Sequence, residues 1–513
     1  MNTDNISSYT KNYGDYPSDP VPRTFSGGES AFAWISFICG YLFCRFYTFS
    51  ARPLGAFLLT LILTAASGGF ILHQKKKLSF LSCVIGISTV TLAFSMLFSQ
   101  NEALCFLSRA YCIVSYIFFV YTATSNLCDA KKGIGDMLIF DFIRALFVLP
   151  MLSLGEIYRA SFAKRSKGSK ALLHVIIGLG VTVIPSAIIV SLLSFDKSFT
   201  DMLKSIFNFK LEQIASNFIS IIFGVPVGMY IFSAYVSGID RKASSVFNES
   251  GRKRASESLK IMPQITAAVA ATPILILYVI FFISQWNTYF SAFSGVLPDN
   301  TIYSEYARSG FFELCWVSVI NLILITLAGV FTKRKSENTG IIVRLLIGVM
   351  SLFTLLLIST AMSKMILYID AFGLTPKRVY SSLFMILLAI VFVFIIIRQI
   401  SRRFNLAFAI VCVSVIMLTV TAFSNIDGQI AKYNIDRSVE GTLTLDVSAT
   451  FELGDAAIPY LVNYYENLPK TDPLRDEIYN RLSVYANKDK IGLFEFTFTH
   501  KKAERALEEL FGK

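Results

Sequence analysis

Charged residues are scarce in this chain. Asp, Glu, Lys and Arg make up 16% of its 513 residues, whereas soluble domains usually carry about 25%. Hydrophobic residues make up 54%, and the mean hydropathy is +0.58. This composition excludes a disordered chain, a collagen-like chain and an ordinary cytosolic protein, and it predicts an integral membrane protein.

Histidine is rarer still, and cysteine shows no ligand pattern. The three histidines are too scattered along the sequence for a multi-histidine metal centre. The eight cysteines lie mostly in apolar runs without a CxxC pair, which is typical of small buried hydrophobic residues. They are Cys39, Cys44, Cys83, Cys105, Cys112, Cys128, Cys315 and Cys412. We therefore expect no metal site and no cofactor.

The short signatures of soluble enzymes are missing as well. No G-x-x-x-x-G-K-[ST] string occurs, which excludes an ATP-driven pump of the P-loop class. No G-x-G-x-x-G follows an expected strand, and neither H-E-x-x-H nor G-x-S-x-G is present. No residue is therefore assigned a catalytic role. The sequence leans away from an enzyme, although membrane enzymes built from scattered carboxylates carry no such string.

Long apolar runs are what the sequence has instead. Eleven stretches are long enough to cross the ~30 Å hydrocarbon layer, which takes about 20 residues of helix. Lipid cannot satisfy backbone polar groups, so each stretch is expected to be helical. The expected spans are residues 31–47, 54–73, 79–98, 103–124, 171–194, 214–237, 263–285, 311–331, 341–363, 380–398 and 404–423. The predicted fold class is all-α, a polytopic transmembrane bundle over residues 30–423.

Basic residues are divided unevenly between the two sides of this bundle. With the N-terminus inside, the inner segments hold 25 Lys and Arg residues and the outer loops hold nine. The positive-inside rule then predicts a cytoplasmic N-terminus and an extracytoplasmic C-terminus. The net charge of +12 fits contact with anionic lipid headgroups. No concentrated soluble basic region is visible, so nucleic acid is not an expected partner.

Three segments fall outside the expected spans. Residues 1–29 are polar and lack the organisation of a signal peptide, so we expect a disordered cytoplasmic tail. Residues 134–157 are apolar but contain Asp141 and Arg144. We expect an interfacial helix there, with these two charges paired, and a twelfth span is the alternative. Residues 424–513 carry a net charge of −4 and are expected to form a mainly helical extracytoplasmic domain.

Local patterns predict the elements of this last region. Apolar spacing predicts helices over residues 453–467 and 499–511. The string Thr471-Asp472-Pro473 predicts the start of another helix, since either Thr or Asp can cap a helix and Pro is tolerated in its first turn. The alternating phenylalanines of residues 494–498 predict a short strand.

Charges at the outer ends of the expected spans are candidate functional residues, because moving a charge out of water is costly. Glu305 and Arg308 stand three residues apart before the span 311–331. Glu313 follows Glu305 by about two helical turns. In a functional interpretation, Glu313 accepts a cation or proton, and Arg308 holds either an anion or the carboxylate. The alternative is a helix-end ion pair with side chains that snorkel to the interface.

A second group of charges flanks the turn after the expected ninth span. Gly373 and the Thr375-Pro376 pair predict a turn followed by a helix start. Asp370 and Arg378 lie on either side of it, and Asp370 is expected to meet either Arg308 or Arg378. A capped loop with solvated charges is the alternative.

The expected span 214–237 contains Gly224 and Gly228 with Pro226 between them. Small residues four apart allow close approach of a second helix. A proline break is also found in the discontinuous helices of transporters. Both the packing and the gating interpretation stay open at this point.

Three longer strings resemble the motifs of one bacterial membrane family. They are EYARSGFFEL at 305–314, LYIDAFGLT at 367–375 and NIDGQIAKYNI at 425–435. Their patterns and their order resemble the family called domain of unknown function 4173, close to its neighbour 4153, over roughly residues 170–465. The resemblance implies a polytopic protein of the bacterial inner membrane, and it implies no activity.

All three strings fall at or just outside the expected outer membrane face. We therefore predict a shared extracytoplasmic polar surface at that face. Its predicted members are Glu305, Arg308, Glu313, Asp370, Arg378, Asp427, Asn434 and Arg437.

Three functions are compatible with this surface. The first is a non-enzymatic envelope protein, active in sensing, scaffolding or assembly, which a flat bundle with a tightly docked C-terminal region favours. The second is a secondary transporter of a small solute or lipid-like molecule, which a cavity reaching the membrane midplane favours. The third is a membrane enzyme acting on lipid or cell-wall precursors, which a lateral groove ending at Glu313 and Asp370 favours. The expected partners are membrane lipids and an envelope protein.

Overall fold

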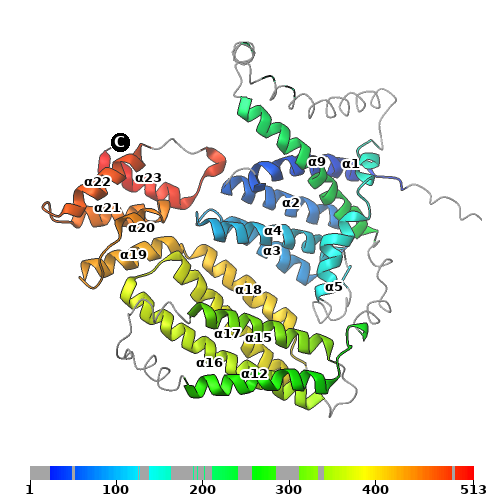
Figure 1. The fold of residues 1–513 in the computed structure, drawn as a ribbon. Helices are drawn as coiled ribbons and strands as arrows, with labels where there is room; N and C mark the ends of the chain where they lie inside the picture. Colours follow the sequence, from blue (N-terminus) through cyan, green and yellow to red (C-terminus); the bar gives the residue numbers. More distant parts are fainter. Residues whose placement is uncertain are drawn as a thin grey trace, which may run out of the picture. The chain divides into compact units, whose positions relative to one another are not determined.

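The computed structural model describes residues 23–48, 52–124, 126–127, 138–162, 211–240, 257–284, 311–332, 340–401, 403–487 and 492–512, with residues 189, 193 and 202. The described residues are predominantly helical, as the sequence predicts (Figure 1). The chain divides into two compact units. One comprises Met1–Tyr41 with Ser153–Ser233, and the other comprises Leu42–Leu152 with Ala234–Lys513.

Among the described residues, eight helices are long and apolar enough to cross a membrane. They are α1 (Gly27–Phe43) with the π-helical η1 (Cys44–Thr48), α2 (Pro53–His73), α4 (Glu102–Ala123), the part Ile219–Ile239 of α9 (Leu211–Ile239), α15 (Phe311–Phe331), α16 (Gly340–Phe372), α17 (Pro376–Ile400) and α18 (Leu406–Phe423). The apolar helices α3 (Phe80–Ser95) and α12 (Gln264–Ser284) coincide with two more expected spans. The expected span 171–194 lies outside the described residues, so the total of eleven spans stays a prediction.

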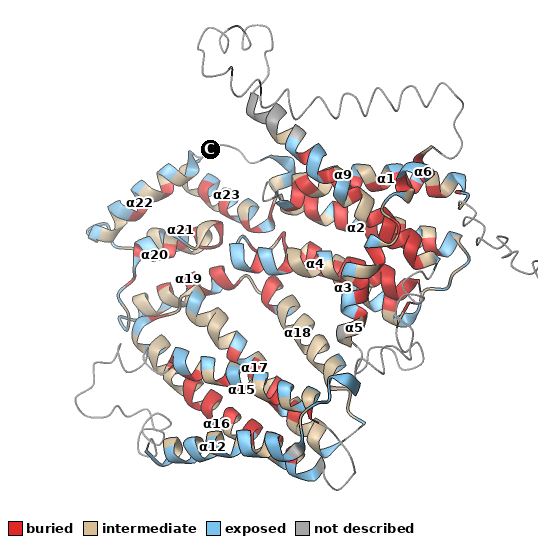
Figure 2. Ribbon diagram, turned by 45° about the vertical axis from the view of Figure 1, so that its right-hand side comes forward, coloured by how far each residue is buried: buried red, intermediate tan, exposed pale blue. Residues whose placement is uncertain are grey.

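Large apolar side chains are exposed along these helices. On α12, Ile265, Val269 and Ile283 are between 65% and 76% exposed, and Figure 2 shows much of this helix as exposed. Apolar patches of this extent are rare on the surface of soluble monomers. Lipid accommodates them, so the protein is an integral membrane protein.

The first unit is held together by close contact between α1 and α9. A β-carbon at Gly224 would lie 2.7 Å from the Cα of Tyr41, and one at Gly228 would lie 2.8 Å from the carbonyl oxygen of Ser36. The backbones of the two helices therefore touch, and the packing interpretation of this glycine pair is confirmed. Helix α9 continues through Pro226.

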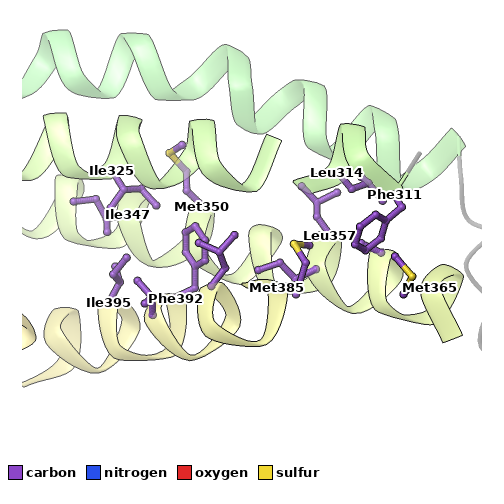
Figure 3. Close-up of a cluster of buried hydrophobic side chains, with 14 of the residues drawn as sticks. Phe311, Leu314, Ile325, Ile347, Met350, Leu357, Met365, Met385, Phe392 and Ile395 are labelled. Carbon is purple, nitrogen blue, oxygen red and sulfur yellow. The ribbon is translucent and has the colours of Figure 1, made fainter. Parts of the chain in front are cut away.

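Helix α16 is the centre of a bundle in the second unit. It packs against α12, α15 and α17, and α18 packs against both α17 and α3 (Figure 1). Buried side chains of three helices interlock between them, among them Phe311 and Leu314 of α15, Leu357 of α16 and Phe392 of α17 (Figure 3). The hydrophobic effect does not hold helices together in lipid. Van der Waals contacts in this close packing therefore supply the attraction between them.

A polar triad links three helices inside this bundle. The side chain of Asn321 on α15 is fully buried. Its Nδ2 donates to Oγ1 of Thr354 on α16 at 2.9 Å, and its Oδ1 accepts from the hydroxyl of Tyr278 on α12. Such hydrogen bonds between helices add to packing where water is absent.

The apolar segment after α4 forms short helical pieces. They are α5 (Leu138–Ile143), η2 (Arg144–Val148), η3 (Leu149–Met151) and, further on, α6 (Glu156–Ser161). Asp141 is buried and accepts from the hydroxyl of Tyr121 at 2.6 Å, and the guanidinium of Arg144 lies 5.8 Å from the centre of that ring. The placement of this segment in the membrane interface and the pairing of its two charges stay predictions.

The C-terminal helices, defined here as α19–α23, have a hydrophobic core of their own. They are α19 (Ile426–Val439), α20 (Val447–Phe451), α21 (Ile458–Asn467), α22 (Pro473–Ala486) and α23 (Phe498–Phe511), with the 3-10 turns η4 (Gly454–Ala456) and η5 (Leu493–Glu495). Leu461, Ile478 and Leu507 bring α21, α22 and α23 together in this core. Helix α22 starts where the sequence predicts, because Oδ1 of Asp472 accepts from the N–H of Leu474.

The predicted strand before the last helix is wrong. Residues 493–495 form the turn η5, and Phe498 already belongs to α23. The alternating rings do not share one face of a strand, because Phe494 packs on Phe46 whereas Phe498 packs on Phe98. Their period of two reflects separate packing partners.

The contact between α1 and α9 gives a first prediction. Gly224→Ala is expected to lower the free energy of unfolding by about 1–3 kcal/mol, because the added methyl group overpacks the contact. Gly329→Ala is the matched control, since a β-carbon there meets no atom within 4 Å. Thermal unfolding of both variants in detergent measures the difference, and equal unfolding temperatures would contradict the contact.

Candidate functional site

The turn between α16 and α17 requires its particular residues. Gly373 has φ of +74°, a backbone conformation that favours glycine. Oγ1 of Thr375 accepts from the N–H of Arg378 at 3.4 Å, and Pro376 is the first residue of α17. A β-carbon at Gly373 would also lie 2.6 Å from Oδ1 of Asn434 on α19. Glycine is therefore needed both for the turn and for its contact with α19.

Asn434 binds this turn through both atoms of its amide. The N–H of Leu374 donates to Oδ1 of Asn434 at 2.8 Å, and Nδ2 of Asn434 donates to the carbonyl of Leu374 at 2.9 Å. One side chain thus satisfies both backbone polar groups of a residue that lies between two helices. This pairing fixes the position of α19 against the end of α16.

Arg378 closes the C-terminal end of α16. Its Nη1 donates to the carbonyl oxygens of Phe372, at 3.0 Å, and Gly373. Its guanidinium also lies 4.0 Å from the centre of the Tyr368 ring. A cation at the carbonyl end of a helix satisfies free acceptors and interacts favourably with the helix dipole. Arg378 therefore stabilises the helix end.

Arg437 joins α19 to the last turns of α16. Its Nη2 donates to the carbonyl oxygen of Asp370 at 3.1 Å, and its Nη1 lies 3.7 Å from the carboxylate of that residue. The same guanidinium donates to the hydroxyls of Tyr433 and Thr442 on the α19 side. The charge partner recorded for Asp370 is thus Arg437, where the sequence suggested Arg308 or Arg378.

A second polar group ties the C-terminal helices to the loop between α3 and α4. Asp455 is buried, and its Oδ2 accepts from Nε2 of Gln100 at 2.6 Å and lies 2.7 Å from Nδ1 of His500. Its Oδ1 accepts from the hydroxyl of Tyr485. Gln100 also donates to Oγ1 of Thr497, the residue that caps α23. Three C-terminal elements and one loop between membrane helices therefore share a single carboxylate.

Burial sets the protonation of Tyr485. Burial is the main cause that raises the pKa of the Tyr485 phenol well above its usual range. The carboxylate of Asp455, which the phenol faces, raises this pKa further. The phenol therefore remains a hydrogen-bond donor to Asp455 at neutral pH.

Backbone groups complete the contact between α23 and this loop. The N–H of Phe498 donates to the carbonyl of Leu97 at 2.8 Å, and Oγ1 of Thr499 donates to the carbonyl of Phe98 at 2.8 Å. The rings of Phe98 and Phe498 lie 4.9 Å apart. The first turn of a helix has N–H groups without intrahelical partners. Here the N–H of Phe498 finds its partner in the loop that follows α3.

Asp427 of α19 is joined to the same loop by a hydrogen bond from Asn101. Nδ2 of Asn101 donates to the buried carboxylate of Asp427 at 3.4 Å, while Oδ1 of Asn101 caps α4 by accepting from the N–H of Leu104. Burial raises the pKa of Asp427, and the hydrogen bond from Asn101 partly opposes this rise.

The structure gathers part of the predicted polar surface. Four of its predicted residues meet around the α16–α17 turn, namely Asp370, Arg378, Asn434 and Arg437. Asp427 lies apart from them, beside Asn101. Glu313 is exposed in the first turn of α15. Glu305 and Arg308 lie outside the described residues.

The group around Asp455 was missed by the sequence analysis. Gln100 and Asp455 are 355 residues apart, and the pair carries no spacing that a motif could record. The available signals were weak. His500 is one of only three histidines, and Thr497 stands at the cap position of the predicted last helix.

A known protein family matches most of this chain. The family described as Domain of unknown function (DUF4153) matches residues 34–464. This is the neighbour named with the resemblance above, and its match begins well before the expected residue 170. The relationship to family 4173 stays a prediction. No curated protein and no solved structure is significantly similar to the chain.

The pairing of Asn434 with Leu374 gives the second prediction. Asn434→Ala leaves the half-buried N–H and carbonyl of Leu374 without this partner. An unsatisfied group costs roughly 1–3 kcal/mol when it is fully buried, so we expect a cost of about 1 kcal/mol, the lower end of this range. We expect α19–α23 to become more sensitive to limited proteolysis. Asn463→Ala is the control, because the side chain of Asn463 bonds only to Asn467, one turn away on its own helix, in the described contacts. The same cleavage rate in both variants would contradict a docking role for Asn434.

Asp427 gives a prediction about pH. Its pKa in the folded protein is above the unfolded value of about 3.9. The folded state therefore binds more protons between these two values, and stability falls as the pH rises through the folded pKa. Asp427→Asn removes this titration. The variant should be more stable than the native protein at neutral pH, and this advantage should shrink as the solution is acidified.

Thermal unfolding of the Asp427 variant at a series of pH values measures the effect. Asp436→Asn is the control, since Asp436 is exposed on the same helix. Native and Asp427→Asn curves that stay parallel over the whole pH range would show that Asp427 is not buried as a carboxylate.

Proposed function

The chain belongs to the DUF4153 family, whose description states no activity, and we propose that it is a non-enzymatic envelope protein. In this proposal the membrane helices hold α19–α23 at the outer face of the membrane, where they meet a ligand or a partner protein. One observation carries the proposal. The polar groups at the α16–α17 turn and at the α3–α4 loop bind the C-terminal helices through side-chain and backbone hydrogen bonds.

The use of these polar groups favours a positioning role. Both amide atoms of Asn434 bind Leu374, and the guanidinium groups of Arg378 and Arg437 bind backbone carbonyls. A catalytic or transport site needs donors and charges directed at a substrate. At this turn they are directed at the protein itself, so a substrate would have to displace structural bonds.

The length of α16 supports the same role. Its 33 residues give a helix of about 50 Å at ~1.5 Å per residue, whereas the hydrocarbon layer is ~30 Å thick. The last turns, which carry Tyr368 and Asp370, are then able to extend beyond the hydrocarbon layer. Asp370 and Arg437 connect this end of α16 to α19. A rigid helix of this length suits the display of attached helices at a membrane surface.

The orientation in this proposal follows from the basic residues. The excess of Lys and Arg in the inner segments favours a bacterial cytoplasmic membrane protein with its N-terminus in the cytoplasm and α19–α23 outside. The partners are then membrane lipids and an envelope protein. The sensing, scaffolding and assembly variants of the proposal share this geometry.

A photo-reactive side chain at Val484 tests the proposal. This position is 69% exposed on α22, outside the core of the C-terminal helices. In intact cells we expect one discrete adduct with a second macromolecule, which is lost when Asn434→Ala and Asp455→Asn undock the helices. A probe at Leu352, an exposed position on a membrane helix, is the control and should give lipid adducts in either background.

Two results would contradict the proposal. One is the absence of a macromolecular adduct from every exposed position of α22. The other is an adduct at Val484 that is equally abundant after undocking, because presentation by the membrane helices would then be irrelevant.

A further inference from the structure

A groove lies between α16 and α17, far from the C-terminal helices. Its volume is about 480 Å³, within the range of roughly 300–1,000 Å³ that is usual for ligand pockets. Leu345, Leu352 and Ile400 line it with apolar side chains that are more than half exposed. Gly348 also lines it, and a β-carbon there would meet no atom within 4 Å. The missing side chain of Gly348 therefore contributes to the depth of the groove.

The groove has the length of one membrane leaflet. Residues 341–352 line its α16 side and extend over about 16 Å at ~1.5 Å per residue. Half of the hydrocarbon layer is about 15 Å thick. Arg344 at this end stands about 40 Å along α16 from Asp370. The groove therefore belongs to the leaflet opposite the side on which α16 contacts the C-terminal helices.

The charged side chains close to this groove on α16 and α17 are all basic. Arg344 lines it, and its Nη2 donates to the carbonyl of Gln399 on α17. A guanidinium carries five N–H donors, so this bond leaves capacity for an anion. Neither α16 before Asp370 nor any part of α17 contains an acidic residue. Arg398, which donates to the carbonyl of Phe404, and the exposed Arg403 follow at the same end.

We propose that this groove binds an anionic glycerophospholipid. One acyl chain lies along Leu345, Gly348 and Leu352, and the phosphate contacts the guanidinium of Arg344. Basic pockets between membrane helices are a recurrent site for anionic headgroups. Free phosphate would occupy only the polar end, whereas a lipid also covers the apolar wall. The groove is thus a lipid site separate from the docking contacts of α19–α23.

Native mass spectrometry of the full-length protein tests this site. The protein is purified in detergent containing equal amounts of phosphatidylglycerol and phosphatidylcholine, and retained lipids are counted. We expect the native protein to retain phosphatidylglycerol preferentially. Arg344→Gln should lower this preference about fivefold, the factor that one basic residue contributes near an anionic surface. Arg344→Lys should keep most of it.

Variants of glycine separate the groove from general lipid contact. Gly348→Phe fills the groove and should abolish retention of either lipid. Gly329→Phe is the matched control, because it adds the same side chain at another open position, on α15. Equal retention by the two phenylalanine variants would overturn the proposal, as would an unchanged lipid preference in Arg344→Gln. Addition of inorganic phosphate should leave retention unchanged, and displacement by phosphate would show an anion site without a lipid.

Discussion

Hydrogen bonding at the ends of the membrane helices is the constraint on which the second unit depends. A helix end leaves backbone groups without intrahelical partners, and close to a membrane these groups need other partners. Asn434 supplies them for Leu374, and Arg378 supplies them for the last carbonyls of α16. In the loop after α3, the carbonyl of Leu97 accepts from the N–H of Phe498 in the first turn of α23. The contacts of Asn434 and of the first turn of α23 therefore both satisfy backbone groups at the ends of membrane helices and dock the C-terminal helices.

Inside the membrane the arrangement of side chains is reversed relative to a soluble protein. Apolar residues of α12 are exposed, while the amide of Asn321 is buried among three helices. Close approach takes the place of the hydrophobic effect between helices. In the first unit it depends on Gly224 and Gly228. Positions that would be tolerant on a soluble helix are thus restricted here by backbone contact.

Much of this architecture could be predicted from local sequence. Apolar runs located the membrane helices, and Asp472 with Pro473 located the start of α22, because each signal lies within one element. Gly373 and Asn434 were singled out through two strings expected at one membrane face, and they do meet. The carboxylate of Asp455 could not be found in this way, since its partners come from distant parts of the chain. The phenylalanine alternation misled because period two arises from tertiary packing as well as from a strand.

The central claim is that α19–α23 are docked on the membrane helices, and two amides report on it directly. The N–H of Leu374 donates to Asn434, and the N–H of Phe498 donates to Leu97 across the same junction. Residue-resolved hydrogen exchange of the native protein in nanodiscs measures both. The account predicts strong protection of the two amides, far above that of Gly492 in an exposed turn. Exchange of Leu374 and Phe498 as fast as Gly492 would contradict it.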